Sequence, residues 1–214
     1  MIAFRKVFAE EKYLMKQIFK LRYQVYTVER SFLPAENYPD KFEKDDFDCQ
    51  STHFAAVNDA DQVLGSVRMI FARPRMLPVR KYCPEVLFDA ICPPESAAEI
   101  SRLVTSRQLR PMLQAHGVTE EEIVLGLCQA MYDECVEKEI THTFALMERT
   151  LSHLLRRYGF QFYCLGNQVD VYGPVKPYVC EVASIEWSDI LQEEAPAPAS
   201  ISFHPLTRTF PMVV

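Results

Sequence analysis

The chain has 214 residues, 49% of them apolar and 24% charged, which is the balance of a globular protein with one sizeable core. The formal net charge of −6 argues against a nucleic-acid binder, because affinity for nucleic acid comes mainly from cationic side chains that neutralise phosphates. No apolar run approaches the roughly 20 residues of a membrane-spanning helix, and the first segment turns acidic too early for a signal peptide. We therefore expect a cytoplasmic protein without stable membrane insertion.

The first half of the chain predicts a strand, a helix, a loop and two more strands. Residues 1–9 alternate loosely and predict a strand, whereas 10–30 lacks Gly and Pro and predicts an amphipathic helix. The apolar stripe of this helix is formed by Leu14, Ile18, Leu21, Val25 and Val28. Residues 31–50 contain two prolines and no period, so we expect a long loop, and long loops within compact domains are usually functional or disordered. Residues 51–57 and 62–72 predict two strands joined by a turn.

The proline-rich segment 73–95 predicts irregular structure, and 96–106 predicts another strand. In that strand, alternation places Ile100 on the face of Ala98. The opposite face receives Glu99, Ser101 and Leu103.

Residues 120–139 predict a second long helix, with Thr119 as its N-cap and Glu122 completing a capping box. Four further elements follow, namely a strand over 140–148, a helix over 148–159, and strands over 160–166 and 169–183. This order predicts an α/β fold with a mixed central sheet and helices on both faces. We expect one domain over 1–192 and a Pro/Ala-rich linker and tail over 193–214.

Charged residues gather in the loop before the strand at residue 51 and within the predicted strands. A charge inside an apolar strand must be paired, because burying it alone costs several kcal/mol. The residues concerned are Arg22, Glu43, Asp45, Asp48, Arg68, Glu99 and Arg102. Two interpretations remain open from the residues alone: an ion-pair cluster that fixes the loop to the sheet, or the polar wall of an active site.

Other kinds of site have little support. The acidic loop lacks the glycine and the ligand spacing of an EF-hand, so we expect no metal site. The seven cysteines contain no CxxC pair and predict reduced, structural residues. No P-loop, GxGxxG or GxSxG motif is present, and we expect no bound cofactor.

Four segments together resemble the autoinducer (acyl-homoserine-lactone) synthase family: LRYQVYTVER, FEKDDFD, GSVRMI and EISRLV. That family has an Arg and an aromatic residue on its first helix, an acidic E-x-D-x-x-D loop, a strand Arg and an E-x-x-R pair. The matching residues are Arg22 and Tyr26, then Glu43, Asp45 and Asp48, then Arg68, then Glu99 and Arg102. Residues 140–183 resemble a closer branch, the PEP-CTERM/exosortase system-associated acyltransferases, which are related to long-chain N-acyl amino acid synthases. The resemblance spans residues 5–183.

This resemblance implies a GNAT-like three-layer acyltransferase fold, in which two parallel strands, here those with EISRLV and THTFALM, splay to admit a pantetheine arm. The implied reaction moves a fatty acyl group from a thioester to the amino group of an amino acid. Alternatives are a lactone synthase that uses S-adenosylmethionine, or a non-catalytic module that binds acyl groups or their carrier.

Two missing features guide the choice of substrates, and autoinducer synthases lack the second of them as well. Autoinducer synthases have a tryptophan after the first helix, whereas the single tryptophan here is Trp187, with Phe32 or Tyr38 as replacements; this favours an ordinary amino acid acceptor. The pyrophosphate loop of coenzyme A-using GNAT enzymes is also missing, which favours acyl carrier protein over coenzyme A as the donor.

The resemblance and the chemistry of acyl transfer suggest a role for each residue. Glu99 is expected to be the general base, with Arg102 and Glu43 as the other catalytic residues. Substrate binding is assigned to Arg22, Tyr26, Asp45, Asp48, Arg68, Ser101, Leu103, Val104 and Thr105, with backbone N–H groups at 103–105 facing the oxyanion. Because acyl carrier proteins are acidic, five arginines are expected to dock the carrier: Arg107, Arg110, Arg149, Arg156 and Arg157.

Overall fold

The computed structural model of the chain describes residues 2–185. Its centre is an eight-stranded sheet in the order β1-β2-β3-β4-β5-β8-β6, with β7 paired to β8. The strands are β1 Ile2–Val7, β2 Ser51–Asn58, β3 Val63–Phe71, β4 Ala97–Thr105, β5 His142–Met147, β6 Phe162–Cys164, β7 Val169–Asp170 and β8 Pro174–Glu181. The β4–β5 pair is parallel and the other strand pairs of the described chain are antiparallel. The predicted α/β class with a mixed sheet is confirmed.

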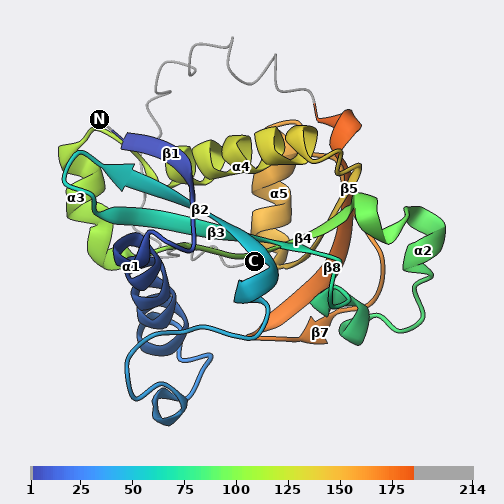
Figure 1. Cartoon of the computed structure of the whole chain (residues 1–214), viewed down its shortest axis with the longest axis horizontal. Helices are drawn as coiled ribbons and strands as arrows, with labels where there is room; N and C mark the ends of the chain where they lie inside the picture. The colour runs from blue at the N-terminus through green and yellow to red at the C-terminus, as the bar shows by residue number, and fades with distance from the viewer. Residues whose placement is uncertain (1, 186–214) are drawn as a thin grey trace, which may run out of the picture.

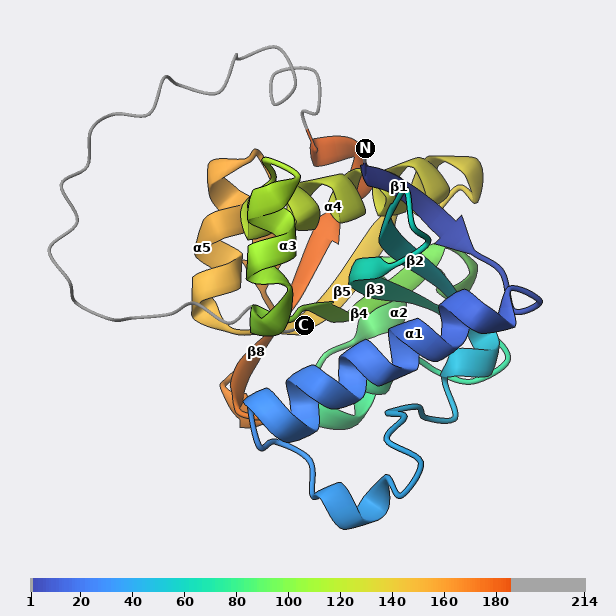
Figure 2. The ribbon, with the colours of Figure 1, turned by 90° about the vertical axis from the view of Figure 1, so that its left-hand side faces the viewer.

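Helices cover both faces of this sheet, as Figures 1 and 2 show. The helices are α1 Lys12–Tyr23, α2 Phe88–Ile91, α3 Arg110–Ala115, α4 Glu120–Glu137 and α5 Arg149–Arg157. One face is covered by α4 and α5, and the other by α1 and, toward the opposite end, by the segment that contains α2. The sheet is therefore the middle of three layers.

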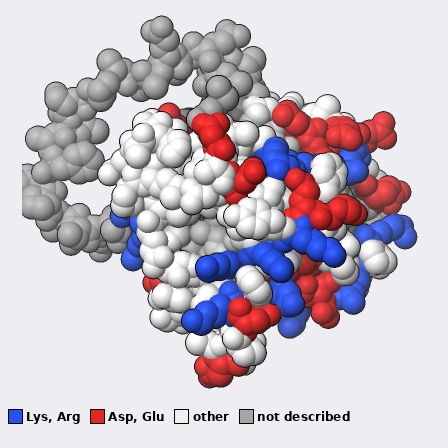
Figure 3. Space-filling model, turned by 60° about the vertical axis from the view of Figure 1, so that its left-hand side comes forward, with Lys and Arg blue, Asp and Glu red and all other residues white. Residues whose placement is uncertain are grey.

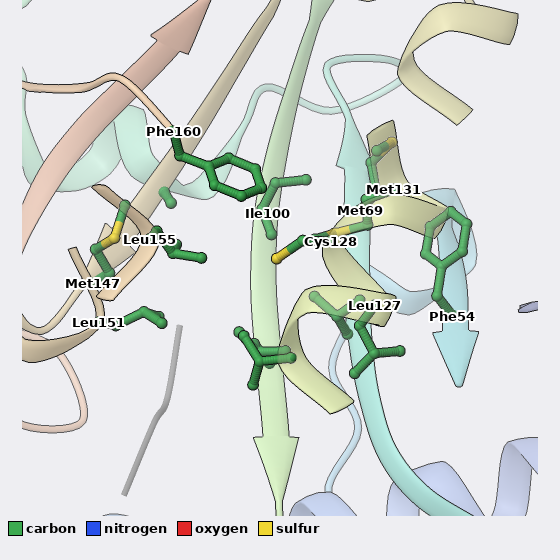
Figure 4. Packing of buried hydrophobic residues seen from close by; sticks show 14 of the residues in the cluster. Phe54, Met69, Ile100, Leu127, Cys128, Met131, Met147, Leu151, Leu155 and Phe160 are labelled. Carbon is green, nitrogen blue, oxygen red and sulfur yellow. The ribbon is translucent and has the colours of Figure 1, made fainter. Parts of the chain in front are cut away.

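The largest apolar cluster lies between the sheet and the two helices α4 and α5 (Figure 4). Leu127 and Met131 of α4 and Ile100 of β4 belong to this cluster. Cys128 and Cys135 belong to the same cluster, and burial raises the pKa of both thiols to about 12. They pack as small apolar groups, as their seven-residue spacing on one helix predicts.

The first helix differs from its prediction over 10–30. The α-helix ends at Tyr23 and continues as a π-helix over Gln24–Glu29. Because the i→i+5 turn is wider than an α-turn, it rotates the following residues, and Val28 is 53% exposed instead of buried. Four residues of the predicted stripe are buried, namely Leu14, Ile18, Leu21 and Val25.

A β-bulge changes the expected faces of β4. Arg68 of β3 pairs with Ser101, and Ser66 pairs with Val104, so two residues of β4 oppose one residue of β3. Arg102 has the left-handed φ of 55° at this bulge. Leu103 consequently packs in the cluster of Ala98 and Ile100, and its predicted place on the face of Glu99 is wrong.

The remaining elements follow the prediction closely. Thr119 and Glu122 form both hydrogen bonds of the capping box at the start of α4. The short helices α2 and α3 were not predicted, and α2 lies in the segment 73–95 that was expected to be irregular. The strand β6 is shorter than the expected strand over 160–166. The predicted linker and tail over 193–214 lie outside the described residues, as does Trp187.

The surface carries its charges unevenly. Figure 3 shows acidic and basic side chains interleaved over one half of the visible face and few charges over the other half. None of the helices that the structure describes is long and apolar enough to cross a membrane.

Candidate active site

The predicted splay between β4 and β5 is present. Residues Ala97 to Ile100 of β4 pair with His142 to Ala145 of β5, and the pairing ends there. Both strands continue beyond that point, β4 to Thr105 and β5 to Met147.

A cavity of about 120 Å³ opens beside the last paired residues. Its walls include Glu99, Ser101 and Arg102 of β4, Arg68 of β3, and Asp45 of the acidic loop. Glu99 and Arg102 are three residues apart, so regular alternation would place them on opposite faces of the strand. The bulge at Arg102 brings both side chains to the same cavity.

Arg22 connects α1 to the acidic loop from a fully buried position. Its Nε donates to Glu43, and its Nη1 and Nη2 donate to the two carboxylate oxygens of Asp48 at 2.7 and 3.3 Å. Burial opposes ionisation of Asp48, but the charges of Arg22 and Arg68 overcome it and lower the pKa of that carboxyl group well below its usual range. The expected ion pairs between the loop and the helix therefore form.

Arg68 and Arg102 complete the network from the sheet. Arg68 Nη1 donates to Asp45 at 2.6 Å and to Asp48 at 2.8 Å, and its Nε donates to Ser101 Oγ at 3.1 Å. Arg102 Nη2 donates to Glu43 at 3.0 Å and to Asp45 at 3.1 Å. Three arginines thus meet three carboxylates, and the cluster has no net charge before Glu99 is counted.

Glu43 is placed differently from its expected catalytic role. Its side chain is 1% exposed, it lies between Arg22 and Arg102, and it does not line the cavity. Asp45, in contrast, has a 29% exposed side chain and lines the cavity. Glu43 therefore holds the arginines in place, and Asp45 is the acidic-loop carboxylate that a ligand in the cavity would meet.

Glu99 differs from the other carboxylates because no arginine within residues 2–185 is hydrogen-bonded to it. One carboxylate oxygen accepts a hydrogen bond from the backbone N–H of Val79 at 2.7 Å. Burial raises the pKa of Glu99 to about 7, against the lowering effect of that hydrogen bond and of the charges on Arg68 and Arg102. A buried carboxyl group that titrates near neutral pH is suited to accept and return a proton.

Two tyrosine rings lie beside Arg102, and only one of the two residues was predicted from the sequence as part of the site. Tyr26 of the π-helix was predicted, and its ring centre lies 5.2 Å from the Arg102 guanidinium. Tyr172 lies next to Tyr26, with the two ring centres 5.8 Å apart; its ring centre is 4.9 Å from the same guanidinium, and its hydroxyl group is 3.4 Å from Arg102 Nη2. Tyr172 and Tyr82 both line the cavity. Tyr172 was expected within one strand over 169–183, but the structure divides that segment into β7 and β8 with Tyr172 between them. No local signal indicated its contact with β4.

The three residues expected at the oxyanion do not line this cavity with their side chains. Leu103 packs toward α4, Val104 packs toward α1, and Thr105 is half-buried. Leu103 instead lines a second cavity of about 50 Å³, with almost wholly apolar walls, that shares Ile100 with the first. The two cavities therefore lie on either side of β4 next to the splay.

The five arginines expected to dock a carrier do not form one patch. Arg110 pairs with Glu120 at 2.6 Å, and Arg107 lies at the turn after β4. The other three belong to α5, where Arg149 and Arg156 line one groove and Arg149 and Arg157 line another. No group of three or more His, Cys, Asp or Glu side chains within residues 2–185 is arranged to hold a metal ion.

Comparisons with known proteins agree with this geometry. Residues 21–115 match the family model described as Acetyltransferase (GNAT) domain. A search of curated proteins found no match. Among solved structures, the AHL synthase LasI superposes with a TM-score of 0.65 at 18% identity, over 85% of this chain and 89% of that one. The CoA-dependent acyl-homoserine lactone synthase BjaI, solved with SAM and isopentyl-CoA, gives 0.62 at 21% identity, over 85% and 84%.

FeeM, an N-acyl amino acid synthase from uncultured soil microbes, gives a TM-score of 0.56 at 16% identity, over 88% of this chain and 94% of that one. At such identities the likeness concerns the fold. The chain therefore carries an acyltransferase domain of the GNAT type, in a fold that it shares with acyl-homoserine lactone synthases and with an N-acyl amino acid synthase.

Proposed function

We propose that the protein is an N-acyltransferase that moves a fatty acyl group from a thioester donor to the amino group of an amino acid. The observation that carries this proposal is the position of Glu99. It is a buried carboxyl group, held by the Val79 N–H, that lines a cavity at the point where β4 and β5 separate. Acylation of an amine needs a base at the place where the donor and the acceptor meet.

The charge balance of the cavity supports an amino acid as the acceptor. Arg22, Arg68 and Arg102 are already balanced by three carboxylates. A zwitterion whose ammonium lies toward Glu99 and Asp45 and whose carboxylate lies toward the arginines keeps that balance. The absence of a tryptophan from the segment after the first helix also favours an ordinary amino acid over S-adenosylmethionine.

The apolar cavity supports a fatty acyl group. It borders the splay and is lined by side chains such as Ile100, Leu103, Met131 and Phe160. An acyl chain that entered it would leave its thioester carbonyl near Ile100, which also lines the Glu99 cavity. Burial of each methylene group there would contribute roughly 0.8 kcal/mol to binding.

The turn at the end of β4 supports a carrier-borne donor over coenzyme A. Glu29 accepts hydrogen bonds from Ser106 Oγ and from the backbone N–H of Arg107, the latter at 3.2 Å. A carboxylate held at these donors repels a diphosphate from the same turn. The absence of the GNAT pyrophosphate motif from the sequence points in the same direction.

In this reaction Glu99 takes a proton from the acceptor ammonium, directly or through a water molecule. The free amine attacks the thioester carbonyl carbon, and backbone N–H groups at 103–105 stabilise the oxyanion. Collapse of the intermediate breaks the C–S bond, and the thiolate leaves with the second amine proton. The products are an amide, a thiol and the proton on Glu99, which passes to solvent.

Mass spectrometry of organic extracts tests the proposal, with cells that overproduce either the wild-type chain or the Glu99→Gln variant. New N-acyl amino acids with the wild type, and none with the variant, are expected. Detection of an acyl-homoserine lactone instead would mean that the acceptor is S-adenosylmethionine and not an ordinary amino acid. If abundant, folded wild-type protein gives no new acylated product, the proposed N-acyltransferase activity is refuted. A module that only binds acyl groups or their carrier is then favoured.

A further inference from the structure

Two adjacent residues at the end of the first helical segment contact the ends of both strands that form the splay. The π-helix ends at Glu29, and Arg30 follows it. Glu29 accepts hydrogen bonds from Ser106 Oγ and from the backbone N–H of Arg107, the latter at 3.2 Å, and these two residues come directly after β4. Arg30 forms an ion pair with Glu148, which directly follows β5. Glu29 and Arg30 are called the clasp below.

The clasp connects the two strands where they no longer pair with each other. The pairing of β4 with β5 ends at Ile100, although β4 continues to Thr105. The stretch from Ile100 to Ser106 spans roughly 20 Å of extended strand, comparable with the length of an extended phosphopantetheine arm. A donor whose thioester lies near Ile100 therefore has the outer end of its arm beside the clasp.

Packing fixes the position of the clasp. The Arg30 guanidinium lies over the ring of Phe32, 4.5 Å from its centre. That ring packs on Gly173, in the turn between β7 and β8, so closely that a Cβ atom there would lie 3.3 Å from it. The side chains of Arg30 and Glu148 are 11% and 19% exposed, so solvent ions screen their attraction only weakly. The segment that carries Glu29 is therefore anchored on both sides.

The carboxylate of Glu29 keeps its negative charge in this position. Its hydrogen-bond partners within the described chain are neutral groups, namely the side chains of Gln24 and Ser106 and a backbone N–H. Arg110 is close enough to interact with the charge of Glu29, but it forms its ion pair with Glu120, at 2.6 Å. A second negative group brought to the same place is repelled, because like charges a few ångströms apart interact unfavourably.

We propose that the clasp determines which thioester donor the splay accepts, because it admits a pantetheine arm and excludes the diphosphate of coenzyme A. The inference rests on the proposed acyl transfer and names the residues that select its donor. Glu29 supplies the repelling charge, and Arg30 prevents that charge from moving aside. Neither residue was assigned a role from the sequence. An arm borne by a carrier protein has a single phosphodiester in place of the diphosphate and meets less repulsion.

Two donors with the same acyl chain isolate the effect of the diphosphate, namely lauroyl-pantetheine and lauroyl-coenzyme A, with a mixture of amino acids as acceptors. The measured quantity is the ratio of kcat/KM for the coenzyme A donor to that for the pantetheine donor, so effects on the acceptor cancel. Glu29→Gln keeps an acceptor for Ser106 but removes the charge. It is expected to raise this ratio at least about tenfold at low salt and less at high salt, mainly through KM.

The matched control is Glu36→Gln, which removes one negative charge from an exposed residue elsewhere. Its ratio is expected to stay within about twofold of the wild type. An equal rise in the two variants would show that net charge, and not the position of Glu29, governs the choice of donor, and would refute the proposal.

Arg30→Gln distinguishes a clasp from a single repelling charge. Loss of this cation makes the surroundings more negative, so charge alone predicts that the ratio falls. Loss of the anchor instead releases Glu29, and the ratio is expected to rise at least about twofold. A fall or an unchanged ratio in the folded variant would contradict the role of Arg30.

Calorimetric binding of coenzyme A and of pantetheine provides a readout that does not depend on turnover. Glu29→Gln is expected to bind coenzyme A at least about tenfold more tightly than the wild type does, and pantetheine equally well. Unchanged affinity for coenzyme A in the folded variant refutes selection by the clasp and leaves acyl transfer intact. If no thioester, an acyl carrier protein included, acylates an amino acid, the proposed function fails, whereas coenzyme A binding still tests the clasp.

Discussion

Glu99 connects the protonation of the candidate active site to the stability of the fold. Its pKa is about 7 in the folded chain and near 4.5 in the unfolded one, so the folded state binds the proton more tightly. Below pH 4.5 both states are protonated, and above pH 7 the folded state carries a buried negative charge. The contribution of Glu99 to stability therefore falls as the pH rises from about 4.5 to about 7 and stays low above it.

We accordingly predict that Glu99→Gln is more stable than the wild type at pH 8, by on the order of 1–3 kcal/mol, and not at pH 4.5. Glutamine keeps an oxygen for the Val79 N–H but cannot ionise. Urea unfolding at the two pH values measures the difference. A variant that is equally destabilised at both pH values would show that folding does not raise the pKa of Glu99.

Arg22 illustrates the opposite case, a buried charge that depends on its partners. Replacing it by glutamine leaves Glu43 and Asp48 with fewer counter-charges inside the protein. We predict a loss of about 3–5 kcal/mol in the free energy of unfolding, measured by denaturant titration at neutral pH. The control is Arg5→Gln, which breaks the partly exposed pair with Glu11 and should cost less than about 1 kcal/mol. Equal losses in the two variants would contradict a buried network.

At the scale of elements, the bulge in β4 determines the site. It directs Arg102 to the cavity of Glu99 and returns Leu103 to the apolar core. The arginine adopts a left-handed backbone conformation that residues other than glycine rarely adopt. Its side chain compensates through Glu43, Asp45 and the ring of Tyr172.

A pair of substitutions separates the backbone cost from the side-chain contacts. Arg102→Gly and Arg102→Val both remove the guanidinium, but only valine must adopt the left-handed conformation at a cost. We predict that the valine variant is less stable than the glycine variant by about 1–2 kcal/mol, by urea unfolding under the same conditions. If the two are equally stable, the bulge has relaxed and does not hold the strand in this form.

At the scale of the whole molecule, the sequence predicted the order of most elements because each has a local signal. The capping box at Thr119 and the turn between β2 and β3 are examples. The bulge has no such signal, since no glycine stands at position 102, and strict alternation assigned Leu103 to the wrong face. The π-helix after Tyr23 also has no local sequence signal, and it was not predicted.

The charged residues of the site were recognisable because arginines and acids inside strands require partners. The sequence did not show which of these residues pair with one another. Glu43 is held between two arginines, whereas none of the described arginines is hydrogen-bonded to Glu99. Tyr82 and Tyr172 reach the site only through tertiary packing of segments distant in sequence. Local patterns do not encode such contacts.

The most direct test of the central claim is the pH dependence of kcat/KM for N-acylation of an amino acid by the purified protein, with product identified by mass spectrometry. The wild type is expected to rise in activity through a pKa near 7, as Glu99 becomes able to accept a proton. The folded Glu99→Gln variant is expected to be at least about 100-fold slower and to lack that rise. Activity of the variant within a few-fold of the wild type, with the same pH profile, would contradict the assignment of Glu99 as the base and of its cavity as the active site.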